Sequence, residues 1–207
     1  MQQTNMALPS SSNHIDFFCL LRACIKQGSL AQARLVLAHL TFHGVSWDAS
    51  SSLGDYVVVT LARCGGREDA LSMAHHLPHP LTLFSWNALL SSSLHDHDAV
   101  QSMYLQMQSQ GIEPNSHTFV PLVRACALTQ DVRQGKRLHA EALHMGGMMT
   151  SDVFLSSSLI GLYTKCRAIV EAEEVFRTTP GHDIVSWNAM LSGYRETGEC
   201  VKALKLY

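Results

Sequence analysis

Apolar residues recur along this chain with the spacing i, i+3, i+4, i+7, which is typical of one face of an amphipathic helix. The pattern appears six times, and its two middle positions are apolar each time. The six stripes are Phe17, Leu20, Leu21, Cys24; Gly54, Val57, Val58, Leu61; Trp86, Leu89, Leu90, Ser93; Phe119, Leu122, Val123, Cys126; Ser156, Leu159, Ile160, Tyr163; and Trp187, Met190, Leu191, Tyr194.

A second apolar stripe follows each first stripe after a short polar or glycine-bearing gap. The second stripes begin at Ala33, Ala70, Val100, Gly135, Ala172 and Ala203. Each pair of stripes predicts a helix A, a turn and a helix B, with Gly28, Gly65 and Gly198 at turns because glycine ends helices well.

Short motifs also return at a long, nearly constant offset. Ser85-Trp86-Asn87-Ala88 returns as residues 186–189, so the two tryptophans are 101 positions apart, and Arg22-Ala23-Cys24 returns 102 positions later as residues 124–126. The chain is therefore a repeat. We predict an N-terminal extension, 1–13, and the units 14–50, 51–82, 83–115, 116–152, 153–183 and 184–207, the last cut inside its second helix.

One hairpin of this length cannot bury both stripes, whereas stacked hairpins share a continuous core. The sequence thus predicts an all-α protein of the α-solenoid class. A hydrophobic content of 46% and a charged content of 15% fit an ordered core, and the net charge of −2 means that any nucleic-acid contacts must be local.

Several kinds of chemistry find no support in the sequence. The six cysteines form no C-x-x-C pair, and Cys24, Cys64, Cys126 and Cys166 sit at equivalent ends of helix A, where we expect buried, apolar side chains. We interpret His95-Asp96-His97-Asp98 as a turn and not as a metal site, and we expect no cofactor. We find no nucleophile motif, no deaminase signature and no membrane-spanning run, and residues 1–13 contain no Arg or Lys of a transit peptide. We therefore predict no enzyme activity and no membrane partner.

Three longer motifs resemble the pentatricopeptide repeat family, over about residues 14–207. Val185-Ser186-Trp187-Asn188-Ala189-Met190-Leu191-Ser192-Gly193-Tyr194 resembles the start of a standard motif, residues 158–166 resemble a short motif, and residues 118–126 with 135–140 resemble a long motif. The resemblance is to plant-type arrays and implies a right-handed superhelix with long units at 14–50 and 116–152, short units at 51–82 (degenerate) and 153–183, and standard units at 83–115 and 184–207 (truncated).

The resemblance implies binding of single-stranded RNA, one nucleotide per repeat, in mitochondria or plastids. It further implies that the protein specifies C-to-U editing sites, with editing cofactor proteins or a deaminase acting in trans. Relatives with this order of motifs often end in a deaminase-like domain. Because a base contact is worth only about 1–3 kcal/mol of discrimination, a few repeats cannot select one transcript, and we expect the native protein to be longer or to work with partners.

Carried over to this sequence, the family's base-reading positions are the fifth residue of helix A and the last residue of the unit. Asn87 with Asn115 would read a pyrimidine, Ser157 with Asp183 a guanine, and Asn188 has its partner beyond the end. Three other pairs depart from the family pattern: Val120 with Asp152, Phe18 with Ser50, and Asp55 with Thr82.

Two more sets of positions complete the implied RNA site. The base-packing residues would be Phe84, Phe154 and Val185, and the phosphate-binding residues Lys26, Arg63 and Lys165.

Position five follows the first stripe residue, so Asn87, Ser157 and Asn188 should leave the buried face and point to the surface of helix A. The alternative is that these three residues are solvated or cap the helix, as Asn and Ser often do. For the basic residues the alternative is a favourable position near a helix C-terminus. For the whole chain it is a protein-binding scaffold of the tetratricopeptide kind, which would build grooves from both helices of each hairpin.

Overall fold

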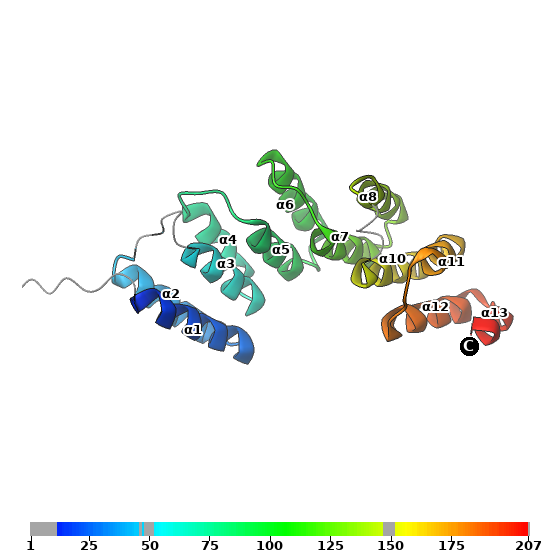
Figure 1. Ribbon diagram of the computed structural model, residues 1–207, viewed down its shortest axis with the longest axis horizontal. Helices are drawn as coiled ribbons and strands as arrows, with labels where there is room; N and C mark the ends of the chain where they lie inside the picture. The colour runs from blue at the N-terminus through cyan, green and yellow to red at the C-terminus, as the bar shows by residue number, and fades with distance from the viewer. Residues whose placement is uncertain (1–11, 46, 48–51, 147–151, 207) are drawn as a thin grey trace, which may run out of the picture. The chain divides into compact units, whose positions relative to one another are not determined.

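The computed structural model describes residues 12–45, 47, 52–146 and 152–206, which form helices and no strand (Figure 1). The chain divides into two compact units, residues 1–92 and 93–207. The first contains α1 (Ser12–Gln27), α2 (Leu30–Phe42), α3 (Leu53–Arg63), α4 (Arg67–His76) and α5 (Leu83–Ser92). The second contains α6 (His97–Ser109), α7 (Ser116–Thr129), α8 (Val132–His144), α10 (Val153–Lys165), α11 (Ile169–Thr178), α12 (Ile184–Thr197) and α13 (Cys200–Leu206).

The helices follow the paired stripes that the sequence predicts. Most stripe residues are buried, including all four of the first stripe in α3, α7 and α10. Leu20 is an exception at 50% exposure. Among the described residues α1 packs mainly against α2 and α3, so the side that carries Leu20 is not covered. The unit boundaries stay predictions, except that Ser12 and Asn13 belong to α1 and residues 1–11 of the expected extension lie outside the described residues.

Neighbouring hairpins meet mainly through their A helices. In the first unit α1 packs on α3 and α3 on α5, and in the second unit α7 packs on α10 and α10 on α12. Side chains such as Val58, Phe119 and Ile160 are fully buried at these contacts. Burial of apolar side chains of this size stabilises by about 1.5–3 kcal/mol each, so the A helices carry most of the core.

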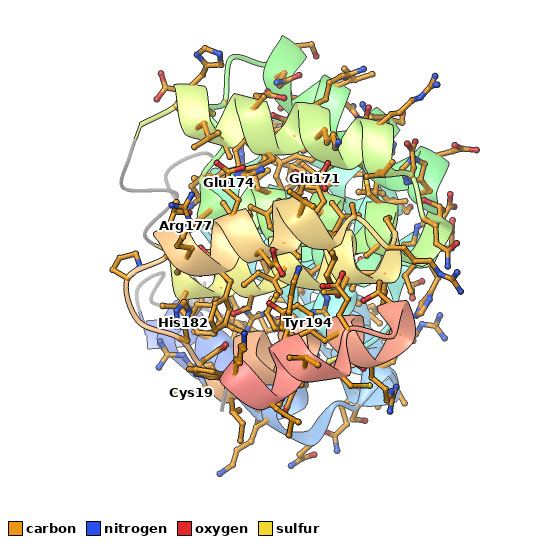
Figure 2. The ribbon with its side chains drawn as sticks, turned by 90° about the vertical axis from the view of Figure 1, so that its right-hand side faces the viewer. Cys19, Glu171, Glu174, Arg177, His182 and Tyr194 are labelled. Carbon is orange, nitrogen blue, oxygen red and sulfur yellow. The ribbon has the colours of Figure 1, made fainter. Side chains whose placement is uncertain are left out.

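The B helices are joined by pairs of polar side chains at equivalent positions. Each second apolar stripe begins at an equivalent position of helix B. The residue that follows this position in one helix B contacts the residue that precedes it in the next helix B. The pairs are Arg34 with Asp69, Gln101 with Gln134, Lys136 with Glu171, and Glu173 with Lys202. Figure 2 shows Glu171 on α11 at its boundary with α8. The three ion pairs among them contribute little each, about 0–1 kcal/mol, but all four pairs repeat one register.

Most turns after a helix A use left-handed backbone, including those at Gly28 and Gly198, whose φ angles are 62° and 78°. In the fourth and fifth hairpins Gln130 and Arg167 take this conformation, each with φ of 57°. Glycine is therefore not required at this turn, since only the backbone hydrogen bonds of the helix end recur.

The cysteines are free thiols, and those at the ends of the A helices are buried or half-buried as expected. Burial raises the pKa of the Cys126 thiol to about 11, which makes it a poor nucleophile. None of the helices that the structure describes is both long and apolar enough to cross a membrane.

Two helical glycines predict opposite effects on stability. A Cβ at Gly193 would lie 2.6 Å from Thr164 Cγ2 and 2.7 Å from Ile169 Cδ1, whereas a Cβ at Gly161 meets no atom within 4 Å. We expect Gly193→Ala to lower the free energy of unfolding. Overpacking costs about 1–3 kcal/mol, whereas the higher helix propensity of alanine over glycine contributes only about 1 kcal/mol. Gly161→Ala, the matched control, should not lower it. Urea unfolding measures both, and equal stability of the two variants would contradict the packing of α12 on α10.

Candidate functional site

A carboxylate at the start of α12 links two neighbouring A helices. Asp183 is the N-cap of α12, and its Oδ1 accepts the Ser186 N–H at 2.8 Å and the Ser186 hydroxyl at 2.6 Å. The Ser157 hydroxyl of α10 lies 2.8 Å from the same oxygen. The two residues that the sequence pairs as a base reader are thus in direct contact.

The environment of Asp183 keeps its carboxyl ionised. Burial raises the pKa of this carboxyl, but the hydrogen bonds from Ser186 and Ser157 outweigh that effect and leave the pKa below its ordinary value. The bonded oxygen is Oδ1, and Asp183 also lines an open pocket. Asp183 therefore brings a negatively charged hydrogen-bond acceptor to that pocket.

Ser157 does not point to the surface as position five was predicted to do. It is only 6% exposed, and its hydroxyl lies within hydrogen-bond distance of the Val153 carbonyl and the Ser186 hydroxyl as well as Asp183. A hydroxyl has one hydrogen, so it donates to one of these partners at a time. The prediction is wrong here because the beginning of α12 covers this position, which an isolated hairpin would leave open.

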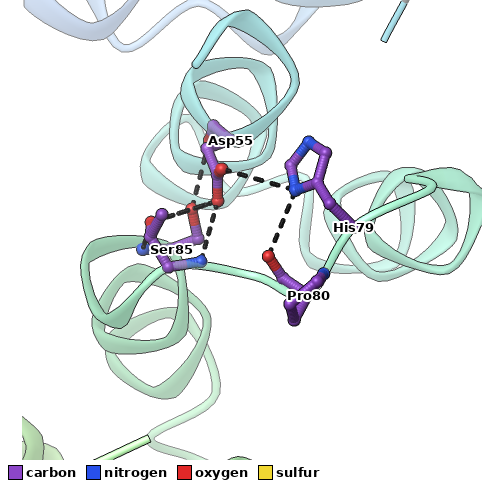
Figure 3. A network of polar contacts seen from close by, with 5 residues as sticks. Asp55, His79, Pro80 and Ser85 are labelled. Carbon is purple, nitrogen blue, oxygen red and sulfur yellow. Dashed lines mark hydrogen bonds and ion pairs between the residues drawn. The ribbon is translucent and has the colours of Figure 1, made fainter. Parts of the chain in front are cut away.

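The first unit contains the same link with the chemical groups exchanged (Figure 3). Asp55, at position five of α3, is 6% exposed, and its Oδ1 accepts the Thr82 N–H and hydroxyl, both at 3.1 Å. The Ser85 hydroxyl donates to the same oxygen at 2.5 Å. Here the carboxylate lies in helix A and the hydroxyl precedes the next helix, the reverse of Ser157 and Asp183.

The second carboxylate oxygen of Asp55 faces a histidine. His79 Nδ1 lies 4.0 Å from Asp55 Oδ2 and 3.1 Å from the Pro80 carbonyl oxygen. Figure 3 shows the imidazole beside the carboxylate, in the segment that connects α4 to α5. Asp55 is therefore enclosed by protein groups. This pair departs from the family pattern, and the structure gives it a structural role.

Five of the predicted site residues line one pocket in the second unit. The pocket has a volume of about 580 Å³ and lies on α7, α10 and the start of α12. Ser157, Asp183, Phe154, Val185 and Lys165 all line it. Phe154 is 68% exposed, so an apolar ring, an acceptor and a cation face one hollow.

An adjoining hollow contains the next predicted reader. Asn188 lines a space of about 380 Å³ that shares Gly161, Lys165 and Val185 with the larger pocket. Asn188 is exposed, as predicted for position five. Lys165 therefore lies where the two hollows meet.

The other predicted residues have separate local partners. Asn115 is the N-cap of α7 and forms a capping box with Thr118. Helix capping, the alternative role for position five, therefore applies to the last residue of this unit. In the first unit the guanidinium of Arg63 lies over the ring of Phe84, 5.7 Å from its centroid. Lys26 is exposed in the last turn of α1, and Asn87 is half-buried in α5. Ser50, paired with Phe18 by the sequence, lies outside the described residues.

The sequence did not predict one charged residue of the larger pocket. Arg124 of α7 lines it together with Val120 and Leu128. Arg124 was available in the sequence only as part of the repeated Arg-Ala-Cys marker, and the spacing of that marker gives no information about which face the side chain takes.

A metal site would require several histidine, cysteine or acidic side chains close together. Among the residues that the structure covers, no three His, Cys, Asp or Glu side chains lie close enough together to hold a metal ion. Asp96, from the His-Asp-His-Asp segment, is the N-cap of α6 and accepts the Ala99 N–H at 3.0 Å.

Hairpins whose A helices stack and are linked by a capping residue define a helical-repeat protein of the α-solenoid class. The fold matches the pentatricopeptide repeat protein PPR10 in complex with an 18-nt psaJ RNA element, with a TM-score of 0.79 and 22% identity over 97% of this chain and 30% of that one. A structure of PPR10 from maize matches with a TM-score of 0.69 and 19% identity, over 97% of this chain and 31% of that one. The predicted α-solenoid fold is confirmed.

Sequence comparisons give the family. The model of the PPR repeat matches residues 185–207. A chloroplastic pentatricopeptide repeat-containing protein of Arabidopsis thaliana is 32% identical over 94% of this chain and 31% of its own length. A second pentatricopeptide repeat-containing protein from the same plant is 35% identical over 96% of this chain and 28% of its own length. A mitochondrial one is 28% identical over 94% of this chain and 24% of its own length.

This chain belongs to the pentatricopeptide repeat family, as its motifs predict. It spans less than a third of the length of these relatives.

The cap at Asp183 predicts a pH-dependent loss of stability. We expect Asp183→Ala to lower the free energy of unfolding at pH 7 by about 0.5–2 kcal/mol, because the cap and the link to Ser157 are lost. Since the folded-state pKa is lowered, this contribution is complete above about pH 3.9 and is lost as the pH falls through the lower folded value. The difference in the free energy of unfolding between variant and wild type should therefore become smaller as the pH falls from 5 to 2, as measured by urea titrations.

Asp98→Ala is the control, because Asp98 is an exposed carboxylate in the first turn of α6 to which no cap bond is assigned. A loss at Asp98 as large as that at Asp183 would show that helix charge alone, and not the cap, carries the effect.

Proposed function

We propose that this chain binds single-stranded RNA along the A-helix side of its hairpins and reads a guanine at Ser157 and Asp183. One observation carries the proposal: the acceptor, the exposed aromatic ring and the cation that base recognition requires line the same pocket. The match to PPR10 in its complex with an 18-nt RNA element supports it.

The chemistry of Asp183 favours guanine over adenine. An ionised carboxylate only accepts hydrogen bonds. Guanine offers two adjacent N–H donors on its Watson–Crick edge, whereas adenine offers an acceptor at the ring nitrogen of that edge. The buried Ser157 fixes the carboxylate through its hydroxyl, so Ser157 acts in this proposal by orienting Asp183.

The walls and the rim of the pocket have separate roles. Phe154 and Val185 are exposed apolar side chains that pack against a base, and such stacking contributes about 1–3 kcal/mol per base. Lys165 binds a phosphate between the guanine site and the site of Asn188. In the first unit Phe84 packs against a base. Arg63, which lies over the Phe84 ring, and Lys26 bind phosphates.

The remaining steps of the proposal rest on the family. Asn87 and Asn115 read a pyrimidine, and Asn188 contacts a further base. Chloroplastic and mitochondrial relatives support an organellar location. The resemblance to plant-type arrays supports a role in specifying C-to-U editing sites, with a deaminase or editing cofactor proteins supplied in trans.

Base preference tests the assignment of Asp183. In binding titrations with RNAs that differ only at the guanine register, Asp183→Asn should shift the preference from guanine toward adenine, because an amide also donates. One good base contact is worth about 1–3 kcal/mol of discrimination, which is about 5- to 150-fold in the ratio of dissociation constants.

Asp152→Asn is the matched control. Asp152 caps α10 as Asp183 caps α12, but its unit has Val120 at position five, so base preference should not change. An unchanged guanine preference in Asp183→Asn, with wild type binding RNA, would refute the reading by Asp183.

A further inference from the structure

We propose that Arg124 is the phosphate-binding residue of the fourth hairpin, and that this hairpin holds a nucleotide there without reading its base. This proposal rests on the proposed RNA binding and adds a contact that the repeat pattern does not assign. Three observations support it. The fourth hairpin has no basic residue at the end of helix A, an open hollow lies beside Arg124, and no ion pair or hydrogen bond is assigned to the Arg124 guanidinium in the described residues.

The fourth hairpin lacks a basic residue at the position where others have one. Lys26, Arg63 and Lys165 occupy the end of helix A, but the equivalent residue in α7 is Leu128, which is 51% exposed. Arg124 lies four residues earlier, one helical turn away on the same face of α7. Both side chains line the 580 Å³ pocket, so Arg124 brings a positive charge to the region that Leu128 leaves neutral.

In the first two hairpins, larger side chains at the equivalent positions fill the space that is open in the second unit. The residues equivalent to Val120, Arg124 and Ser158, each 102 positions earlier, are Phe18, Arg22 and Tyr56. The rings of Phe18 and Tyr56 are in edge contact, with centroids 5.2 Å apart. Arg22 Nε donates to the Tyr56 hydroxyl at 3.4 Å. Two aromatic rings therefore occupy this space, and the arginine is tied to one of them.

In the second unit smaller side chains leave that space open. Val120 and Ser158 replace the two aromatic residues, and both line the pocket. The Ser158 hydroxyl donates to the Phe154 carbonyl of its own helix, so its hydrogen is already engaged within α10. No ion pair or hydrogen bond is assigned to Arg124 in the described residues, and its side chain is exposed.

The chemistry of the α7 side of the hollow fits a nucleotide of any base. Apart from Arg124, this side is lined by Val120, Ala127 and Leu128, which have no hydrogen-bonding side-chain groups and so cannot distinguish base edges. A guanidinium pairs well with a phosphate through two parallel N–H donors. The other titratable groups of the pocket are His95, Lys165 and Asp183, and Asp183 is already bonded to Ser157 and Ser186.

The salt dependence of RNA binding tests this assignment in the whole chain. For single strands the logarithm of the binding constant falls with the logarithm of salt by about 0.7 per phosphate contact. Arg124→Gln should reduce that slope by about 0.7. It should also weaken binding equally for all RNAs that differ only in the base at the fourth hairpin. Arg137→Gln removes the same charge from the exposed face of α8, to which no RNA contact is assigned, and should leave the slope unchanged.

A rescue variant separates charge from structure. In Arg124→Gln with Leu128→Lys, the cation returns at the position that other hairpins use, and the wild-type slope should return with it. If Arg124→Gln keeps the wild-type slope, or changes base preference at this register, the phosphate assignment is wrong. If wild type binds no RNA at all, the proposed function fails and not this assignment alone.

A filled variant tests the hollow itself. Val120→Phe with Ser158→Tyr copies the arrangement of the first two hairpins and should weaken RNA binding at least tenfold while the unfolding temperature stays within a few degrees of wild type. Unchanged RNA affinity in this folded variant would show that RNA does not enter the hollow.

Discussion

The packing of each helix A on the helix A of the next hairpin is the constraint on which the rest of this structure depends. A single hairpin would leave one side of its A helix in water, and only a neighbour can cover it. In the second unit α10 is covered by α7 on one side and by α12 on the other. The residues at these two contacts set both the stability of the array and the distance between successive sites.

The same contact explains why position five is not simply a surface position. The N-terminus of the following A helix arrives over it, and the N-cap needs a polar partner. At the start of α12 the cap is the carboxylate of Asp183, and its partner at position five is Ser157. At the start of α5 the carboxylate is Asp55, at position five, and its partner is Thr82, which precedes the next helix. The first arrangement leaves an acceptor in an open pocket, and the second is closed by His79. One structural link can therefore serve either recognition or stability alone.

Side-chain size between neighbouring A helices decides whether a hollow exists. Phe18 and Tyr56 fill in the first unit the space that Val120 and Ser158 leave open in the second. The backbone arrangement is the same helix pair in both cases, α1 on α3 and α7 on α10. Smaller side chains at these two positions thus accompany an open pocket in the second unit, where the arginine equivalent to Arg22 also lacks a tyrosine hydroxyl as its partner.

The apolar stripes by themselves determined the helices, their pairing and the repeat, because burial of one helical face has a period that the sequence records directly. They also predicted the exposed position of Asn188. Only the tertiary structure decided that Ser157 is covered, that Asp55 is enclosed, and that Arg124 shares a pocket with Asp183. These facts depend on which side chains of the next hairpin arrive at each position, and helical periodicity within one hairpin contains no record of that.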